Sequence, residues 1–450
     1  MPYATAAIMP AMMPSAYNVG SFGSQVNRAT EASFGHLSGG ECTSVASERY
    51  QEALTGRATL AVVDQGQHKH ILITFGRSFL TLNLARLLAA AGHRVSTADS
   101  VPIAVSRFSK AVAGFHRVSP PKYQPQKYCR EIAAIVEAEG IDLVIPIHEE
   151  TDILAMMAGL FPPSCELFLS DFALEDTLHN KLKFQQALVE MGIETLKFAS
   201  ITGPEDIAEL DFDTPFAVKQ AYSRGSQLVI KAYPGDELKQ LTFDPTNPWI
   251  AQEWLEGDRY CTYSICRDGE VFAHATYPVK YAIGGSSCLT FEQVRHAGIE
   301  EWVRDVIRRT GFTGHIGFDF IDHPDRGLVT IEANPRATSG IMMFTPESRV
   351  DRAFFGENDE VIYPPTGRVR MIGIGMALYG WRKDSLPGNN FRQFVRDFRA
   401  ADDVIAEKGD MKPAVMLVAA YGNILRHSVR YRVGLAGGFM HDHEWDGHQI

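Results

Sequence analysis

The sequence lacks long apolar runs: no stretch approaches the ~18–20 consecutive apolar residues that a membrane-spanning helix requires. The first residues, MPYATAAIMPAMMPSAYNV, contain three prolines and lack the basic start and continuous apolar stretch of a secretion signal. Cysteine is scarce as well, since the chain has six, at no spacing typical of a metal site or a disulfide framework. These absences predict a cytoplasmic protein with reduced thiols and no membrane partner.

The sequence also lacks an excess of positive charge. Its 43 Lys and Arg residues stand against 54 Asp and Glu residues, which gives a formal net charge of −11 at pH 7. Binding to a nucleic-acid backbone depends on neutralising phosphates with Lys and Arg, so we expect no nucleic-acid partner. A nucleotide needs only a few well-placed cations and is compatible with this charge. Hydrophobic residues make up 45% and charged residues 22%, which is typical of a folded chain.

Strand and helix patterns alternate from His70 onward. The string HILITFG predicts a buried strand, SFLTLNLARLLAAAGH a helix that ends at Gly92, and RVSTADS a second strand. The strings KYCREIAAIVEAEG and IDLVIPI repeat the helix and the strand. Such alternation predicts an open parallel sheet with right-handed crossovers, which we assign to residues 69–176. Residues 1–68 show no sustained periodicity and predict a loosely ordered arm.

A dinucleotide-binding fingerprint is missing from this domain. The first strand ends in TFGRS and not in a GxGxxG turn, which argues against a nicotinamide-dependent oxidoreductase. His148, Glu149 and Glu150 follow the strand DLVIPI at its carboxyl end, where open α/β sheets place substrate contacts. The alternative interpretation is a buried strand end followed by a solvated pair of acids.

After residue 176 the pattern changes to short strands separated by turns, which is typical of an α+β fold. We predict a two-lobed domain at residues 177–350, with a small lobe at about 195–256, and a mixed C-terminal segment at 351–450. The last residues include HDHEWDGH, which offers histidines and acids to a metal. We interpret this string as a flexible polar terminus and assign it no site.

The most informative stretch is HIGFDFIDHPDRGLVTIEANPRATSG, residues 315–340. Alternation along its second strand places Glu332 and Asn334 on one face, and closure through the turn places Asp319 opposite Glu332. Two carboxylates and an amide oxygen are ligands that suit Mg²⁺. Arg336 follows a proline at a fixed bend, and its planar fork suits a carboxylate or a phosphate. The alternative interpretation is an ordinary hairpin with surface acids.

Two further strings offer groups to a nucleotide. In PFAVKQAYSRGS, a lysine ends an apolar strand and a Gly/Ser loop follows, so a cation lies beside backbone N–H donors that suit a triphosphate. In WIAQEWLEG, an apolar strand presents its end to a planar base. A hairpin turn and an edge strand with solvated acids are the alternative interpretations of the two strings. The residues concerned are Lys219, Ser223, Gly225 and Ser226 in the first string, and Gln252, Glu253 and Leu255 in the second.

The order of these groups along the chain resembles that of the ATP-grasp superfamily, over about residues 70–345. The resemblance implies two α+β lobes that hold ATP with Mg²⁺, or alternatively Mn²⁺, between them. The ribose-binding acid of the family often stands where this chain has Arg259, so we assign that role to Asp258, with Glu256 as the alternative. The other implied roles are phosphate binding by Lys181, Lys219 and the Gly/Ser loop, adenine binding by Gln252, Glu253 and Leu255, metal binding by Asp319, Glu332 and Asn334, and substrate contacts by Arg336 and Lys280.

The implied activity is that of an ATP-dependent ligase. Such an enzyme activates a small-molecule carboxylate as an acyl phosphate, releases ADP, and lets an amine, here expected to be an amino acid, form a C–N bond. Dimers are common in the superfamily, so a homodimer is compatible with the resemblance. The chain is also similar to mycosporine-glycine synthases, which phosphorylate an enolic cyclohexenone so that glycine can displace the phosphate. This second resemblance is carried by RFSKAVAGFHRV, IVEAEGIDLVIPI and the region Asp402–Val418. A nucleotide-binding protein without turnover is the third alternative, disfavoured by the pair of carboxylates.

Overall fold

The structure is a computed structural model that describes residues 68–223, 229–283, 287–386, 388, 390–448 and 450, and the statements below concern these residues. They belong to one compact unit, Gln65–Ile450. The arm predicted for residues 1–68 lies outside the described part of the chain, apart from His68. The predicted class, α/β followed by α+β, is confirmed by the sheets of this unit.

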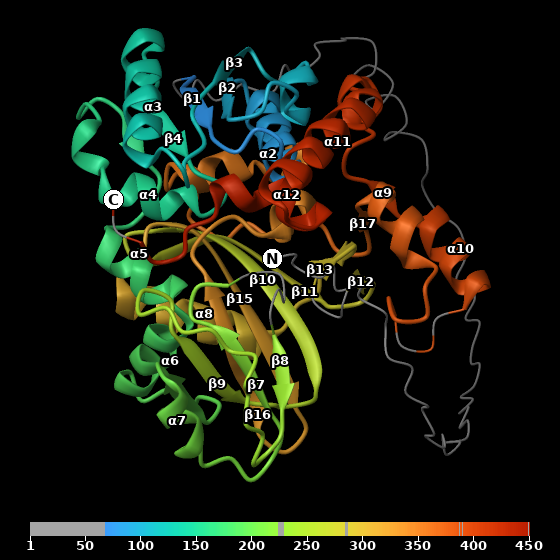
Figure 1. Ribbon diagram of the computed structural model, residues 1–450. Helices are drawn as coiled ribbons and strands as arrows, with labels where there is room; N and C mark the ends of the chain where they lie inside the picture. The colour runs from blue at the N-terminus through green and yellow to red at the C-terminus, as the bar shows by residue number, and fades with distance from the viewer. Residues whose placement is uncertain (1–67, 224–228, 284–286, 387, 389, 449) are drawn as a thin grey trace, which may run out of the picture. The chain divides into compact units, whose positions relative to one another are not determined.

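The N-terminal part of the unit is an open parallel sheet with the strand order β3-β2-β1-β4-β5 (Figure 1). Helix α3 ends at Gly140, whose φ of 62° provides the left-handed cap that the sequence predicted. Strands β1 and β4 are neighbours, so their carboxyl ends lie at the same edge of the sheet. The elements are His70–Ile73 (β1), Phe79–Ala90 (α2), Arg94–Asp99 (β2), Gly114–Arg117 (β3), Pro125–Glu139 (α3), Leu143–Ile145 (β4), Glu150–Met156 (α4) and Glu166–Leu167 (β5).

A small antiparallel sheet, with the order β6-β9-β7-β8, follows in the chain. Its apolar face is closed by its own small core, in which Phe212 stacks on Phe216 with ring centroids 4.6 Å apart. The sheet lies within residues 195–256, and we refer to it below as the small lobe. The elements of this region are Phe172–His179 (α5), Lys181–Glu190 (α6), Phe198–Ile201 (β6), Pro204–Ala208 (α7), Phe216–Gln220 (β7), Ile230–Ala232 (β8) and Trp249–Glu253 (β9).

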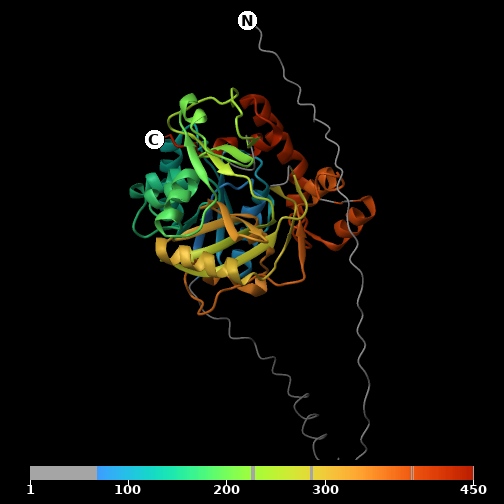
Figure 2. The same cartoon turned by 90° about the horizontal axis from the view of Figure 1, so that it is seen from below.

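The larger antiparallel sheet has the order β11-β10-β15-β16. Helix α8 covers one face of it (Figure 2), where Trp302 packs edge-on against Phe318 and Phe320 at 5.1 and 5.0 Å. A hairpin with Asp268 at its turn joins β10 to β11. The elements are Asp258–Arg267 (β10), Glu270–Pro278 (β11), Ala282–Ile283 (β12), Ser287–Cys288 (β13), Thr290–Glu292 (β14), Ala297–Thr310 (α8), Gly314–His323 (β15) and Gly327–Asn334 (β16).

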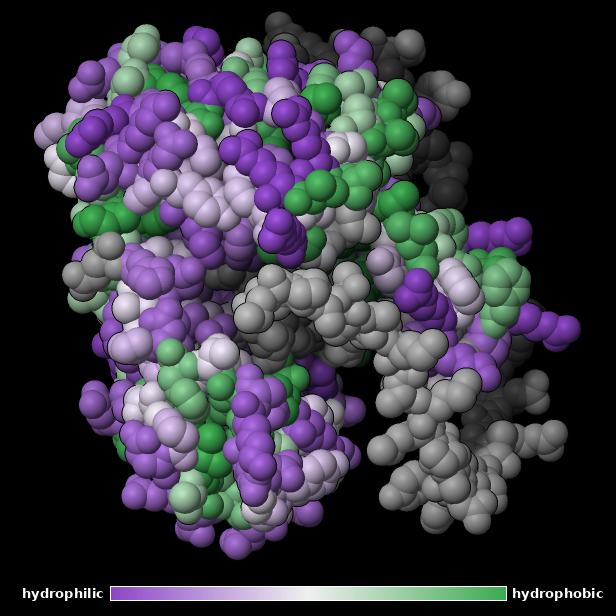
Figure 3. Space-filling model, viewed as in Figure 1, coloured by the Kyte–Doolittle hydropathy of each residue, from purple (hydrophilic) through white to green (hydrophobic). Residues whose placement is uncertain are grey.

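The C-terminal segment adds helices to this framework and a short sheet, β14-β17-β18. Helix α11 lies against the 3₁₀ turn Val105–Phe108 of the N-terminal part, and its outer side exposes Val415, Val418 and Val429, in the region where apolar atoms gather in Figure 3. None of the helices within the described ranges combines the length and the apolar character that a bilayer crossing needs. The elements are Val369–Met371 (β17), Gly373–Gly375 (α9), Phe391–Ala400 (α10), Asp402–Asp403 (β18), Lys412–Tyr431 (α11) and Leu435–Met440 (α12).

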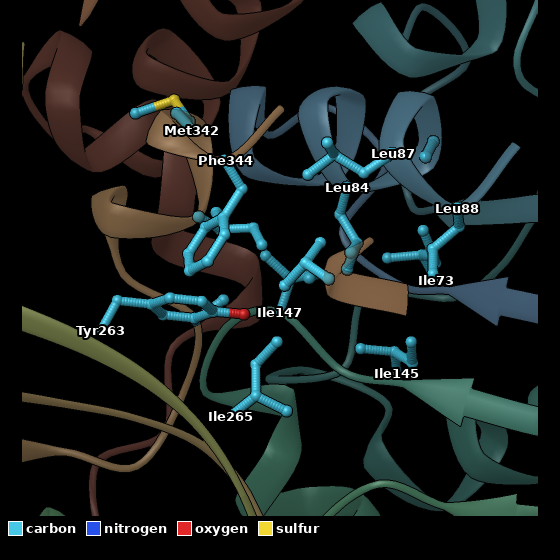
Figure 4. Close-up of a cluster of buried hydrophobic side chains, with 14 of the residues drawn as sticks. Ile73, Leu84, Leu87, Leu88, Ile145, Ile147, Tyr263, Ile265, Met342 and Phe344 are labelled. Carbon is cyan, nitrogen blue, oxygen red and sulfur yellow. The ribbon is translucent and has the colours of Figure 1, made fainter. Parts of the chain in front are cut away.

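One hydrophobic core joins the N-terminal sheet to the larger antiparallel sheet. In Figure 4, Ile147, which follows β4, lies between Ile145 and Tyr263 of β10, with Ile265 below. The labelled leucines of α2 lie above them. Because interiors pack at the density of organic crystals, a shared core holds these two layers together as a single body. Side chains that project from either sheet where the two meet are therefore held in fixed positions relative to each other.

Candidate active site

A cleft of about 850 Å³ opens between the N-terminal sheet, the two antiparallel sheets and the C-terminal helices. Its walls include the ends of β7, β9 and β16, the segment after β1, and the last residues of α12. Most of the residues that the sequence singled out meet there. The members of that set are Lys181, Lys219, Ser223, Gln252, Glu253, Leu255, Asp319, Glu332, Asn334 and Arg336.

Two carboxylates and an amide converge on one face of the β15–β16 hairpin. Asp319 is the register partner of Glu332, as the sequence predicted, and Asn334 follows two residues later on the same face. The register shifts directly after Asp319, so Ile331 is an extra residue whose carbonyl accepts hydrogen bonds from Gln185 (3.3 Å) and Gln252 (3.4 Å). This bulge ties the hairpin to α6 and β9, and so fixes the two carboxylates relative to the small lobe.

The electrostatics of the hairpin fit a divalent cation. Burial and the neighbouring charge of Glu332 raise the pKa of Asp319 to about 6. Burial alone would raise the pKa of Glu332 as well, but Lys181 and Lys219 outweigh it and hold that pKa at about 2. A raised pKa on one of two adjoining carboxylates shows that they repel each other. Asp319, Glu332 and Asn334 therefore offer the hard oxygen ligands that Mg²⁺ prefers, at a place where a positive charge would relieve the repulsion.

Two buried lysines reach the same carboxylate from different elements. Lys181 is the first residue of α6, after the N-cap Asn180, and its Nζ lies 3.5 Å from Glu332 Oε2 and 2.5 Å from the Ser223 carbonyl. Lys219 lies in β7, with its Nζ 3.8 Å from the same oxygen. Burial lowers the pKa of Lys219 to about 8, although Glu332 acts to raise it. The two ammonium groups offer charged donors to an anionic ligand such as a polyphosphate.

The small lobe lines the opposite wall through the end of β9. Gln252 and Glu253 lie in this strand, and Glu253 forms a bidentate pair with Arg326 at 2.9 and 2.8 Å. Trp254 leaves the strand, and its backbone N–H donates to the Pro215 carbonyl at 3.0 Å. Trp254 and Leu255 both line the cleft and add apolar side chains to this wall.

The two acids considered for a ribose contact differ in whether they line the cleft. Glu256 lines the cleft and pairs with Lys231 at 3.7 Å, and Lys231 also lies over the Trp254 ring at 4.4 Å. Asp258 begins β10 and is exposed, opposite Asp322 in the register, and the described lining of the cleft does not include it. The geometry thus favours Glu256 over Asp258 for that role.

Arg336 connects the hairpin to the N-terminal sheet. Its Nη2 donates to Asn334 Oδ1 at 2.9 Å, and its Nε lies 3.9 Å from Glu149 Oε1. Glu149 lies 3.6 Å from His179, which lies 3.0 Å from Asp152. Burial acts to lower the pKa of His179, but these two carboxylates outweigh it and raise the pKa to about 9. A protonated His179 thus lies behind Glu149 and holds it toward Arg336.

The acids after DLVIPI are not solvated. Glu149 is 1% exposed and Glu150 is fully buried, where it accepts hydrogen bonds from Thr74 Oγ1 (2.6 Å) and from two backbone N–H groups. The interpretation as a solvated pair of acids is therefore wrong. His148 lines the cleft, so the carboxyl edge of the N-terminal sheet does face the candidate site.

Besides Asp258, one predicted site residue in the described part of the chain does not line the cleft, and two others are not described. Lys280 lies in the turn between β11 and β12, half exposed, with its Nζ 2.5 Å from Glu292 Oε2, and the described lining of the cleft does not include it. Gly225 and Ser226 fall outside the described residues, and only Ser223 of the predicted loop is seen, at the edge of the cleft.

The C-terminal tail is the largest departure from the sequence-based interpretation. Asp442 and His443 are fully buried, and Asp442 accepts hydrogen bonds from Arg77 at 2.9 and 3.1 Å. The backbone N–H of Trp445 donates to Glu149 Oε2 at 3.0 Å, and the centroid of the Trp445 ring lies 5.0 Å from that of the Tyr222 ring. The prediction of a flexible terminus is therefore wrong. No cluster of three His, Cys, Asp or Glu side chains in the described residues is arranged to hold a metal, and the tail is no exception.

Comparisons with known proteins agree with this geometry. A family model described as an ATP-grasp domain matches residues 178–340. N5-carboxyaminoimidazole synthetase from Staphylococcus aureus has 17% identity and a TM-score of 0.55, over 74% of this chain and 96% of that one. L-amino acid ligase from Bacillus licheniformis has 14% identity and a TM-score of 0.50, over 68% and 79% of the two chains.

A third solved structure contains a bound nucleotide. The biotin carboxylase domain of the Hydrogenobacter thermophilus 2-oxoglutarate carboxylase, in complex with MgADP, has 12% identity and a TM-score of 0.51, over 68% of this chain and 74% of that one. A search of curated sequences found no match. At these identities the structural likeness shows a shared fold, while the family model identifies the domain that carries the carboxylates and lysines.

Proposed function

We propose, on the premise that this chain belongs to the ATP-grasp superfamily, that it is an ATP-dependent ligase for small molecules. It transfers the γ-phosphoryl group of ATP to a carboxylate, and an amine, expected to be an amino acid, displaces the phosphate to form a C–N bond with release of ADP. The observation that carries the proposal is the convergence of Asp319, Glu332 and Asn334 with two buried lysines on one side of a cleft.

The nucleotide is proposed to lie along the small-lobe wall. Gln252, Glu253 and Leu255 contact the adenine, and Glu256 or Asp258 the ribose. Lys181, Lys219 and Ser223 bind the phosphates, together with Gly225 and Ser226, which are included on sequence grounds alone. Support comes from the cleft itself, because Leu255 and the two lysines all line it.

The metal ligands and lysines act on the charge of the reacting phosphoryl group. Asp319, Glu332 and Asn334 would hold Mg²⁺, which offsets the negative charge of the phosphates. Lys181 and Lys219 are already oriented by Glu332, so they stabilise developing charge with little reorganisation. Arg336, held by Asn334, is proposed to hold the substrate carboxylate in line with the γ-phosphorus.

The test is an ADP-release screen with purified protein, ATP and Mg²⁺ over amines and small carboxylic acids, followed by the mass of the product. We expect ADP release that requires both Mg²⁺ and a carboxylate, and its loss in Glu332→Gln. Glu270→Gln, at an exposed position on the β10–β11 hairpin, is the matched control. Turnover by Glu332→Gln would overturn the metal assignment. ATP binding without ADP release for every acid and for enolic cyclohexenones would favour a nucleotide-binding protein without turnover.

A further inference from the structure

The cleft has two chemically different ends. Charged side chains gather at the nucleotide end, where Lys181, Lys219 and Arg259 lie near Glu332 or Asp319. Lys231 also lines the cleft and pairs with Glu256. The end at the carboxyl edge of β1 is instead walled by large apolar side chains, which all belong to the core shared by the two larger sheets or pack directly against it. The members of this apolar wall are Phe75, Phe79, Leu80, Met342, Ile372, Phe439 and Met440.

The apolar wall is assembled from segments far apart in the sequence. Phe439 of α12 packs against Phe75 with ring centroids 5.7 Å apart, and against Phe79 of α2 at 6.0 Å. Figure 1 shows α12 running beside α2 where these contacts occur. The backbone carbonyl of Phe439 also accepts a hydrogen bond from Arg77 Nη1 at 3.3 Å. The position of α12 is therefore fixed both by ring packing and by a buried cation.

Phe75 is held in an unfavourable backbone conformation at this wall. Its φ of 52° lies in the left-handed region that non-glycine residues rarely adopt, and such conformations persist only when the surroundings impose them. The side chain is 2% exposed, and it lines the cleft at the point where β1 ends. The surroundings that impose this conformation are the rings of His148, Phe439 and His443, whose centroids lie 4.9, 5.7 and 4.6 Å from that of Phe75.

Charge is scarce at the apolar wall. Among the described lining residues of this end, Arg336 is the one Lys or Arg side chain. The nearby Arg77 is not available to a ligand, because it is 3% exposed and bound by Asp99 and Asp442. Ser78 caps α2, and Thr338 Oγ1 donates to the Thr262 carbonyl at 2.7 Å. A ligand carboxylate at this end can therefore pair with Arg336, which also lies 3.9 Å from Glu149.

We propose that the activated substrate is an amphipathic monocarboxylate: one carboxylate, held by Arg336, on a branched or aromatic hydrocarbon body that packs on the apolar wall. Dicarboxylates are excluded, because their second charge would be buried among Phe75, Phe79 and Phe439 without a counter-ion. The inference rests on the proposed function for the role of Arg336. It adds the substrate class, which follows from residues outside the matched ATP-grasp region.

The first test uses the unmodified protein. ADP release is measured with Mg-ATP, hydroxylamine as a general trap for acyl phosphates, and the series acetate, propionate, butyrate, 3-methylbutyrate and 3-phenylpropionate. A buried methylene contributes about 0.8 kcal/mol, so kcat/KM should rise about fourfold for each added carbon. Succinate should be a poor substrate. A flat series, or a preference for succinate, would overturn the inference and leave the proposed function intact.

A variant pair then locates the effect on the wall. Phe439→Val should lower kcat/KM for 3-phenylpropionate at least about tenfold, and for acetate less than about twofold, because only the larger acid reaches the ring. Phe391→Val, at a phenylalanine that is 69% exposed on α10, is the matched control and should change neither value. Equal losses for the two acids would indicate a structural defect and would contradict the inference.

Binding measurements separate the inference from the proposed function. Calorimetry of 3-phenylpropionate and succinate in the presence of ADP and Mg²⁺ reports recognition without turnover. Tighter binding of 3-phenylpropionate would support the substrate class even if no acid releases ADP, in which case the proposed ligase activity fails. Tighter binding of succinate, or binding of neither acid, would overturn the substrate class.

Discussion

Glu332→Gln should change the protonation of Lys219 as well as the metal site. The carboxylate lies 3.8 Å from Lys219 Nζ and 3.5 Å from Lys181 Nζ, and it supports the charge of two buried ammonium groups. Burial already lowers the pKa of Lys219 to about 8 in the intact protein. Without Glu332 the burial penalty stays and its main compensation is lost, so this pKa should fall further.

The geometry sets an upper limit for the change. At an effective dielectric constant of about 20, unit charges separated by the Nζ–Oε2 distance attract each other by about 4 kcal/mol. One pKa unit corresponds to about 1.4 kcal/mol, so removal of the Glu332 charge lowers the pKa of Lys219 by at most about 3 units. Lys219 would then lose its proton below pH 7 and carry little charge at neutral pH.

The assay is the affinity for ATP without divalent metal, in EDTA, measured by calorimetry from about pH 5 to about pH 10. Lys219 attracts the phosphates only in its protonated form. The affinity for ATP is therefore constant below the pKa of Lys219 and falls by up to tenfold per pH unit above it. We expect the fall to begin at about pH 8 in the wild type. In Glu332→Gln it should begin below about pH 7.

Lys219→Met, alone and combined with Glu332→Gln, supplies the reference for each protein, because the ratio of affinities cancels the ionisation of ATP itself. Lys280→Met is the control for a lysine outside the cleft, since Lys280 is half exposed and paired with Glu292. If the fall begins at the same pH in the wild type and in Glu332→Gln, the reasoning about this charge cluster is refuted. A fall that persists in Lys219→Met would assign it to another group.

Three further outcomes are expected. Asp442→Asn removes a buried counter-charge of Arg77 and should lower the free energy of unfolding in urea by about 3 kcal/mol, and a loss below about 1 kcal/mol would contradict a structural role for the tail. The carboxylates around His179 outweigh its burial and raise its pKa to about 9, so protonated His179 stabilises the fold fully below pH 6.5 and progressively less up to pH 9. The free energy of unfolding should therefore fall by about 3 kcal/mol over that range in the wild type and stay level in His179→Gln. Trp445→Ala removes the ring packed 5.0 Å from Tyr222 and should raise the Kd for ATP several-fold with little change in kcat, whereas an unchanged Kd would separate the tail from the phosphate-binding loop.

Local patterns determined much of the fold and part of the candidate site. The alternation of strands and helices after His70 predicted the parallel sheet, because each βαβ unit is complete within a short stretch of chain. The pairing of Asp319 with Glu332 was predictable for the same reason: the two strands are joined by a short turn, and side chains alternate along each strand. Lys181 and Lys219 gained meaning only from their order relative to this hairpin.

Only the tertiary structure decided what surrounds those groups. From the sequence, Asp442 is expected to be a solvated acid, but in the structure it pairs with Arg77, 365 residues earlier in the chain. Phe439 lines the cleft only because α12 packs on α2. The same holds for Glu149, which the sequence left open and which burial and His179 direct toward Arg336. Contacts between such distant segments leave no periodic signal, because they depend on how completed elements pack. The sequence by itself indicated the residues proposed to bind the nucleotide, because they are neighbours in a hairpin or follow a strand. Packing between remote segments decided the end that is proposed to receive the second substrate.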